Sequence, residues 1–265
     1  MLAALLTIFA LYLALAAALT LAQGRIVYPA PPGSGSEPAG FERVVYRTSD
    51  GLDLAAGYRA AAPGHPTILY FHGNGADWQS SVVATDRMVP QGYGVLAAEY
   101  RGYRGNPGRP SEQGLIRDGR AAVAWLAERG VAPSDTVVIG NSIGGGVATR
   151  VASEVQPAAL ILISPFSSLT ELAREKAWWL PTGLLLRDRY DNAALLPQVR
   201  SPVLILHGDA DDLIPLEHAR RLARTRTGTE LMVVRGAGHD LAWLPEAEHH
   251  ALAFLERIDR GVLPE

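Results

Sequence analysis

Short apolar runs separated by longer amphipathic stretches dominate the chain from Phe41 onward. Each run is almost continuously apolar, which is typical of strands buried on both faces of a parallel sheet. The first two runs flank Asp50-Gly51 and predict a β-hairpin. The expected strands, with the hairpin first, cover residues 44–46, 52–58, 67–71, 94–100, 136–139, 159–163, 202–206 and 231–234.

The amphipathic stretches between these runs predict helices. They cover residues 80–91, 111–129, 144–154, 216–225 and 245–259. Strands that alternate with helices at this spacing predict an α/β fold with a doubly wound, mostly parallel sheet. In such a fold the binding crevice lies at the carboxyl ends of the strands.

Residues 167–200 break the alternation. They contain Trp178-Trp179 and Leu184-Leu185-Leu186, but no clear strand. We interpret the segment as a lid inserted over the crevice. The alternative is an ordinary helix whose aromatic side chains belong to the core.

The N-terminal segment has no polar face. Residues 1–22 carry no charged side chain, and the first charge is Arg25. As a helix they would reach ~33 Å, enough for a bilayer core of ~30 Å. We therefore expect a transmembrane anchor over residues 1–24, a Pro/Gly/Ser-rich linker over residues 25–40 and a single domain over residues 41–265.

A cleaved signal peptide is the alternative for the N-terminal segment. Such a peptide normally begins with Lys or Arg and has a shorter apolar stretch, although Thr20-Leu21-Ala22 resembles a cleavage site. The position of Arg25 after the segment slightly favours a cytoplasmic location for the domain.

Composition excludes several classes of function. With 24 basic and 27 acidic residues and no run of Lys or Arg, the chain has no charge pattern that favours nucleic acid. The absence of Cys excludes disulfides, thiol catalysis and Cys-based metal sites. No carboxylate accompanies His249-His250 at metal-ligand spacing, so we expect no metal site and no cofactor.

Gly140-Asn141-Ser142-Ile143-Gly144 carries the strongest chemical signal. It follows an expected strand and precedes an expected helix, which is the context of a nucleophile elbow. Side chains in place of the flanking glycines would collide with neighbouring backbone in so tight a turn. The pattern predicts Ser142 as a nucleophile, and a plain glycine turn is the alternative.

A second glycine-rich turn, Phe71-His72-Gly73-Asn74-Gly75, closes the first central strand. In a fold with a nucleophile elbow, this turn and the residue after the nucleophile donate backbone N–H groups to the developing oxyanion. We therefore expect Asn74 and Ile143 to form the oxyanion hole. His72 is expected to brace the loop and to take no part in proton transfer.

The remaining catalytic groups are expected in two later loops. His239 lies on a glycine-containing loop after the last strand and is the expected base, and the order Ser, Asp, His fits the elbow. Asp209, Asp211 and Asp212 compete as the acid. We favour Asp211, because Asp209 lies close to the strand end and Asp212, as a direct neighbour, would point elsewhere. The remaining histidines outside these motifs are expected at the surface: His65, His218, His249 and His250.

These motifs together resemble those of the serine aminopeptidase-like α/β hydrolases, and most of all a membrane-anchored subgroup similar to protein depalmitoylases. The resemblance covers about residues 41–260. It implies the α/β-hydrolase fold and an esterase-type site on Ser142, Asp211 and His239. Arg104 stands where the subgroup usually has Gly, and Glu99 where it has Asp. The matching segments are residues 71–75, 100–103, 110–112, 114–115, 140–146, 164–166, 211, 214–215 and 238–239.

The expected function is hydrolysis of an ester or thioester through an acyl-enzyme on Ser142. The substrate would be a small or acylated molecule, and residues 1–22 would supply the contact with the membrane. A peptidase is the nearest alternative, and it would need carboxylates such as Glu171, Glu175 and Asp188 to hold an α-ammonium group. A non-catalytic scaffold is a third. Removal of residues 1–24 is expected to release a soluble, active domain.

Overall fold

The computed structural model describes residues 1–31 and 37–262 and confirms the expected α/β fold. Its strands are β1 (Glu42–Arg47), β2 (Asp53–Arg59), β3 (Thr67–Phe71), β4 (Gly94–Ala98), β5 (Thr136–Asn141), β6 (Ala159–Ile163), β7 (Val203–Gly208) and β8 (Thr229–Val234). They form one eight-stranded sheet in the order β1-β2-β4-β3-β5-β6-β7-β8. β1 pairs with β2 and β2 with β4 in antiparallel fashion, whereas all pairs from β4 to β8 are parallel.

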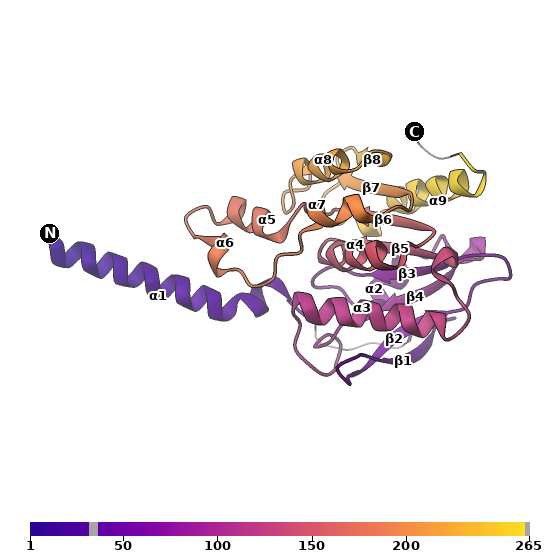
Figure 1. Cartoon of the computed structure of the whole chain (residues 1–265), viewed down its shortest axis with the longest axis horizontal. Helices are drawn as coiled ribbons and strands as arrows, with labels where there is room; N and C mark the ends of the chain where they lie inside the picture. Colours follow the sequence, from indigo (N-terminus) through magenta and orange to yellow (C-terminus); the bar gives the residue numbers. More distant parts are fainter. Residues whose placement is uncertain (32–36, 263–265) are drawn as a thin grey trace.

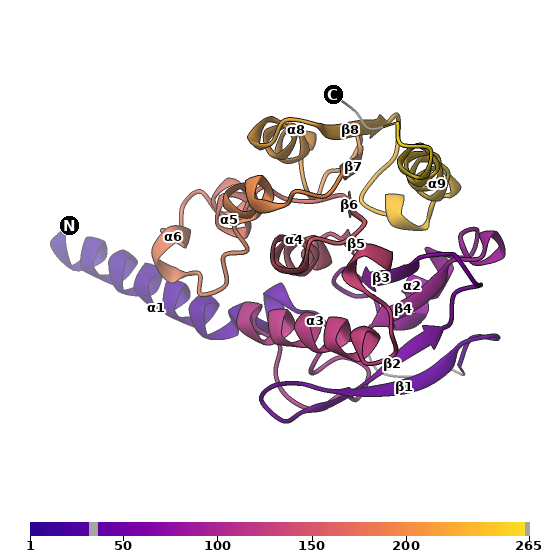
Figure 2. The same cartoon turned by 45° about the vertical axis from the view of Figure 1, so that its right-hand side comes forward.

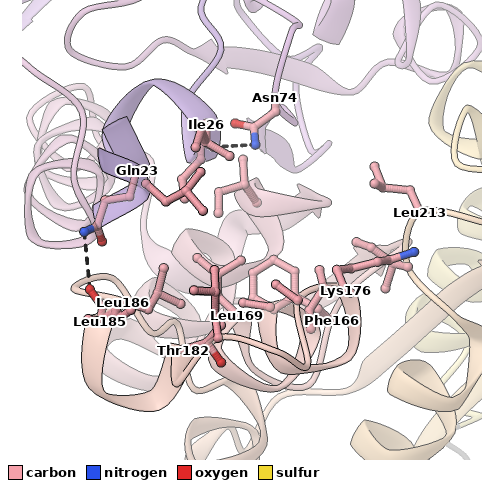
Figure 3. Close-up of a pocket in the computed structure, with 18 of the residues that line it drawn as sticks. Gln23, Ile26, Asn74, Phe166, Leu169, Lys176, Thr182, Leu185, Leu186 and Leu213 are labelled. Carbon is pink, nitrogen blue, oxygen red and sulfur yellow. Dashed lines mark hydrogen bonds between the residues drawn. The ribbon is translucent and has the colours of Figure 1, made fainter. Parts of the chain in front are cut away.

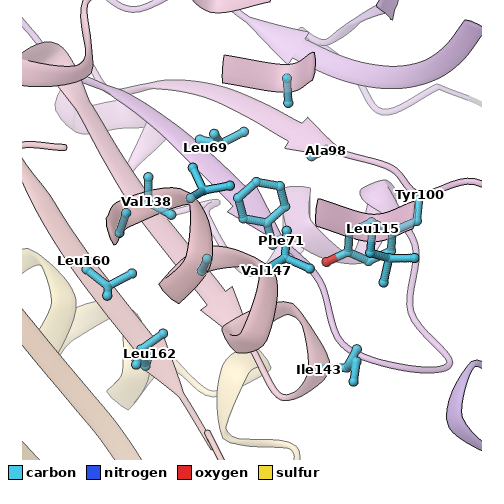
Figure 4. Close-up of a cluster of buried hydrophobic side chains, with 14 of the residues drawn as sticks. Leu69, Phe71, Ala98, Tyr100, Leu115, Val138, Ile143, Val147, Leu160 and Leu162 are labelled. Atoms are coloured by element: carbon cyan, nitrogen blue, oxygen red, sulfur yellow. The ribbon is translucent and has the colours of Figure 1, made fainter. Parts of the chain in front are cut away.

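Helices cover both faces of the sheet (Figures 1 and 2). α3 (Glu112–Ala127), α4 (Ile143–Val155) and α8 (Leu216–Thr225) pack on one face, and α2 (Trp78–Val83) and α9 (Pro245–Asp259) pack on the other. In β3, Leu69 and Phe71 face the first set of helices, and Ile68 and Tyr70 face the second. Both faces of the strand are therefore buried, which explains the continuous apolar run. Figure 4 shows Phe71 beside Val147 of α4.

The expected helix at 80–91 is not continuous. α2 ends at Val83, and a separate 3-10 turn, η1, covers Val89–Gln91. Pro90 explains the break, because it lacks an N–H and its ring would clash with the carbonyl of Asp86 in an unbroken α-helix. The start of α2 is set by Asp77, whose carboxylate accepts the backbone N–H of Ser80 at 3.0 Å.

Residues 167–200, which we call the lid, contain short helices and no strand of the sheet. These are α5 (Leu169–Lys176), α6 (Thr182–Leu185), α7 (Asn192–Leu195) and the 3-10 turn η3 (Leu196–Gln198). Trp178 is 81% exposed and Leu184 is 87% exposed. Trp179 is 41% exposed, so neither tryptophan belongs to the core, whereas Tyr190 near the end of the segment is 1% exposed and does belong to it.

The N-terminal helix α1 (Leu2–Val27) is long and apolar enough to cross a membrane, with a mean hydropathy of 2.5. It projects away from the sheet, and α6 lies beside its length in both views (Figures 1 and 2). The helix continues three residues past the expected end of the anchor at residue 24. Tyr28, expected in the linker, is buried. Residues 32–36 of the expected linker and 263–265 of the expected domain lie outside the described residues.

Candidate active site

Ser142 occupies the sharp turn between β5 and α4. Its backbone has φ 52° and ψ −118°, a conformation that non-glycine residues rarely adopt. Its N–H donates to the carbonyl of Ile163 at 2.9 Å. A Cβ on Gly140 would lie 2.5 Å from the Cβ of Ala148, and one on Gly144 would overlap the carbonyl oxygen of Phe71. The flanking glycines are thus required by backbone packing around the serine.

Ser142, His239 and Asp211 lie in one hydrogen-bonded row. His239 Nε2 is 3.1 Å from Ser142 Oγ, and His239 Nδ1 is 2.8 Å from Asp211 Oδ2. The three residues come from the loops after β5, β8 and β7, which meet at the carboxyl edge of the sheet. The side chain of Asp211 is fully buried, while that of His239 is 25% exposed. This is the arrangement of a nucleophile, a base and an acid that orients the base.

Asp211 alone of the three neighbouring aspartates contacts the imidazole. Its second oxygen, Oδ1, accepts the N–H groups of Leu213 at 3.0 Å and Ile214 at 2.8 Å. Burial raises the pKa of Asp211, but the hydrogen bonds from His239 and from the Ile214 N–H outweigh burial and hold the pKa below its ordinary value. Asp209 instead accepts the N–H of Gly236 at 2.6 Å, and Asp212 is exposed.

His207 lies behind the acid and was not singled out by sequence reasoning. Its Nε2 is 2.8 Å from the carbonyl of Ile214 and 3.6 Å from Asp211 Oδ2. Burial lowers the pKa of His207 by more than these two partners raise it, so the ring is neutral. Its place near the carboxyl end of β7, just before the three aspartates, was the signal in the sequence that could have identified it.

The expected oxyanion donors, Asn74 and Ile143, line the same cavity as Ser142. Ile143 is the first residue of α4, where the helix dipole favours negative charge. Within residues 1–31 and 37–262, the backbone N–H of Asn74 has no hydrogen-bond acceptor. The Asn74 side chain holds its loop, because Nδ2 donates to the carbonyl of Val27 at 2.6 Å and Oδ1 accepts from Tyr103 at 3.1 Å. Both backbone donors are thus available at the pocket that contains Ser142.

His72 and Glu99 form a buried pair beneath the oxyanion loop. His72 Nε2 is 2.6 Å from Glu99 Oε1, and Nδ1 is 2.8 Å from the carbonyl of Gly73. Burial lowers the pKa of His72, but Glu99 and this carbonyl raise it more, and the net shift is upward. His72 therefore braces the loop, as expected. The second oxygen of Glu99 accepts the N–H of Trp78 at 3.1 Å.

The prediction that His218 lies at the surface is wrong. His218 is 1% exposed. Its Nδ1 accepts the N–H of Ser167 at 3.2 Å and lies 2.7 Å from the Ser167 hydroxyl, and Nε2 is 3.2 Å from Glu175. The polar residues around it in the sequence suggested exposure, but the first helix of the lid covers that face of α8. Arg104, at a position where the resemblance led us to expect Gly, adopts φ 45°, a conformation that glycine adopts more readily.

A cavity of about 440 Å³ opens above Ser142. Its walls come from the loops around the serine, from the lid and from the end of α1 (Figure 3). Of the described residues that line it, Lys176 is the only charged one. The carboxylates considered for a peptidase bond elsewhere: Glu171 to Arg221, Glu175 to His218 and Asp188 to Tyr28. Among the described residues no group of three or more acidic or His side chains is arranged to hold a metal ion.

Comparison with known proteins gives consistent matches. The model of the "Alpha/beta hydrolase family" matches residues 68–197. Over 227 residues the chain is 39% identical to "Uncharacterized protein Rv2307c" of Mycobacterium tuberculosis, covering 82% of this chain and 80% of the relative. Over 243 residues it is 30% identical to "Alpha/beta hydrolase domain-containing protein 17B" of Homo sapiens, covering 88% and 78%. The solved structure of the Pyrococcus furiosus esterase Pf2001 shares the fold, with a TM-score of 0.68, 21% identity and coverage of 86% and 97%.

Proposed function

Because the chain belongs to the alpha/beta hydrolase family, we propose that Ser142, His239 and Asp211 hydrolyse a carboxylic ester or thioester through an acyl-enzyme. The protein is a serine hydrolase of the ester-cleaving type. The main support for these three catalytic roles is the row of hydrogen bonds from Ser142 Oγ through His239 to Asp211, which lies beneath a mostly apolar cavity.

Acylation begins when Ser142 Oγ attacks the acyl carbon while its proton passes to His239 Nε2. The oxyanion that forms accepts the N–H groups of Asn74 and Ile143, and one such donor contributes about 3 kcal/mol. The protonated imidazole is stabilised by Asp211 and gives the proton to the leaving alcohol or thiol. Water, deprotonated by His239, then attacks the acyl-serine, and the carboxylic acid leaves as Ser142 recovers its proton.

The pocket supports an acyl ester or thioester over a peptide. A peptidase for short N-terminal substrates would need an acidic group to pair with the α-ammonium, whereas none of the described residues that line the cavity is a carboxylate. Apart from Lys176 and Thr182, the lid residues that line the cavity are apolar, such as Leu169 and Leu172, and this suits a hydrocarbon group.

We place membrane attachment in α1, with the domain on the cytoplasmic side. The helix has the length and hydropathy to span a bilayer, and Arg25 follows its apolar part. Full-length protein should stay in the membrane pellet after alkaline carbonate extraction, and a reporter at the C-terminus should be active in the cytoplasm. Extraction of the uncleaved chain into the supernatant contradicts the anchor, and a reporter active only outside contradicts the orientation.

Labelling with a fluorophosphonate and replacement of the nucleophile test the proposed catalytic residues. Ser142→Ala should abolish labelling and lower turnover of acyl esters by about 10⁴-fold or more, because the nucleophile is lost while the fold remains. Ser153→Ala, on the same helix but bonded to the carbonyl of Arg150, is the matched control and should keep its activity. A Ser142→Ala protein that keeps more than about a tenth of the turnover contradicts the role of Ser142.

A further inference from the structure

The C-terminal end of α1 is fixed to the catalytic domain at several points. The carbonyl of Val27 accepts the side-chain amide of Asn74, whose backbone N–H is the proposed oxyanion donor. The same loop also binds the chain just after α1, because Gly75 N–H donates to the carbonyl of Pro29 at 3.0 Å. Tyr28 donates to Asp188 of the lid at 2.8 Å. These bonds hold the helix end at a fixed position relative to Ser142.

A second set of bonds joins α1 to the lid. Gln23 donates from Nε2 to the carbonyl of Leu185 at 3.3 Å and accepts at Oε1 the N–H of Arg187 at 2.9 Å. Figure 3 shows Gln23 of α1 above Leu185 and Leu186 of the lid, with the cavity beside them. Farther along the helix, Tyr12 donates to the carbonyl of Trp179 at 3.1 Å.

The helix end is also part of the cavity wall. Leu19, Thr20, Gln23, Ile26 and Val27 line the same cavity as Ser142. Opposite them stand apolar residues of the lid, among them Leu169, Leu172, Leu185 and Leu186. The cavity is therefore closed on one side by a helix that the sequence alone assigns to the membrane. A volume of about 440 Å³ falls within the ~300–1,000 Å³ typical of sites for small ligands.

The lid follows α1 into its apolar part. Tyr12 lies about 22 Å from Val27 at ~1.5 Å per residue, so the bond to Trp179 lies at the level of the uncharged turns of the helix. The lid exposes Trp178 and Leu184 in this region, and α6 lies beside α1 in both views (Figures 1 and 2). Apolar surface of this kind beside a membrane helix is suited to lipid contact.

We propose that one side of the last turns of α1, which carries Leu19, Thr20, Gln23, Ile26 and Val27, forms a wall of the acyl-binding site and determines which acyl chains reach Ser142. The inference rests on the proposed function and assigns the membrane helix a second role, in substrate selection. The substrate is an amphiphile with a linear acyl chain on an ester or thioester. Removal of residues 1–24 would then remove part of the substrate site, in contrast to the active soluble domain expected from the sequence.

Two leucines of α1 provide a matched test in the full-length protein. Leu19 lines the cavity, whereas Leu21 is 82% exposed and lies about 200° away around the helix. Leu19→Trp and Leu21→Trp add the same bulk to the same membrane helix. The measured quantity is the ratio of kcat/KM for a dodecanoyl p-nitrophenyl ester to that for the butanoyl ester, in mixed detergent micelles.

Leu19→Trp should lower this ratio by about tenfold or more, because each methylene excluded from an apolar site loses its transfer free energy. Leu21→Trp should stay within about twofold of the unmodified chain. Ile26→Trp is the second cavity-lining variant and should lower the ratio as Leu19→Trp does. The proposal is overturned if a cavity-lining variant has the same ratio as the unmodified chain and Leu21→Trp. This comparison counts only for a variant whose Ser142 still reacts with a short fluorophosphonate.

Parallel assays identify the polar group that carries the acyl chain. A dodecanoyl glycerol ester and an S-dodecanoyl cysteinyl peptide are presented in the same mixed detergent micelles, and Leu19→Trp should slow hydrolysis of whichever one the unmodified enzyme cleaves faster. Labelling of Ser142 and its loss in Ser142→Ala test the proposed function separately. A labelled, ester-cleaving enzyme with an unchanged chain-length ratio therefore refutes only the role of α1.

Discussion

The sheet side of the cavity is held by buried polar groups and close backbone contacts, whereas the lid and α1 on the other side expose apolar side chains. Asp211 is fully buried and accepts three hydrogen bonds, and Ser142 is fixed in a strained turn. Trp178 on the lid is 81% exposed. Catalysis requires reacting atoms that are placed within fractions of an ångström, and the sheet side is packed rigidly enough to provide this. Binding of an acyl chain requires only apolar surface, which the lid and α1 provide.

The largest effect expected on the sheet side is loss of the acid. Asp211→Asn should reduce turnover by about 10⁴-fold, because the amide cannot hold His239 in the required tautomer or stabilise its protonated form. Asp209→Asn and Asp212→Asn should each cost much less, since neither side chain contacts the imidazole. Steady-state kinetics of the three variants on one ester measure the difference. A larger loss at Asp209 or Asp212 would mean that Asp211 is not the acid.

A pair of glycines compares packing on the two sides. Gly144→Ala would drive a methyl group into the carbonyls of Phe71 and His72, and should lower the free energy of unfolding by about 2–3 kcal/mol. Gly183→Ala in the lid would place its methyl group 3.7 Å from Arg174 Nη2, an ordinary van der Waals contact, and should be neutral or slightly stabilising in a helix. Urea denaturation measures both. Similar losses in the two variants would show that the lid is packed as tightly as the elbow.

A buried carboxyl group makes the stability of the sheet side depend on pH. Burial and the nearby Asp86 raise the pKa of Glu248 on α9 to about 7, above the value expected in the unfolded chain. The folded state therefore binds this proton more tightly, and its stabilising effect is complete at low pH and lost as the pH rises through about 7. Between pH 5 and 8, the native chain should lose about 1–2 kcal/mol of stability relative to Glu248→Gln.

Urea titrations at each pH check this difference, and the partly exposed Glu171 of the lid provides the control. Its pKa is lowered by hydrogen bonds from Ser167 and Arg221, and Glu171→Gln should not remove the loss of stability between pH 5 and 8. A Glu248→Gln protein whose stability follows the same pH dependence as the native chain contradicts the assignment to Glu248.

The smallest effect is expected at the exposed surface of the lid. Trp178→Ser should change the free energy of unfolding by less than about 0.5 kcal/mol, because so exposed a side chain buries little area on folding. Thermal unfolding in detergent measures this change. A loss of several kcal/mol would instead place the indole in the packed interior and remove the contrast between the two sides.

Local patterns were sufficient for much of the catalytic edge. The runs at 67–71 and 159–163 match β3 and β6 residue for residue, because a strand buried on both faces has a continuous apolar signature. The glycines around Ser142 predicted a crowded turn, and the close contacts that a side chain would make at Gly140 and Gly144 explain why glycine is needed there. Asp211 was favoured over Asp209 and Asp212 for its place in the loop, and its carboxylate lies 2.8 Å from His239 Nδ1.

Sequence failed where the environment of a residue comes from distant parts of the chain. His218 lies among polar residues of an amphipathic helix, and only the packing of the lid against α8 buries it. The lid sequence allowed either a core helix or an exposed insertion, because apolar residues alone do not say whether another element covers them.

The sequence by itself determined the order of strands and helices along the chain, the nucleophile elbow and an apolar helix long enough to span a membrane. Each of these features depends only on residues that are close together in the sequence. Only the tertiary structure decided that Gln23 binds the lid and that Leu19 and Ile26 share a cavity with Ser142. A uniformly apolar helix has no polar face, so its sequence pattern does not show which side faces lipid. The packing of the lid against α1 decides which side of the helix lines the cavity.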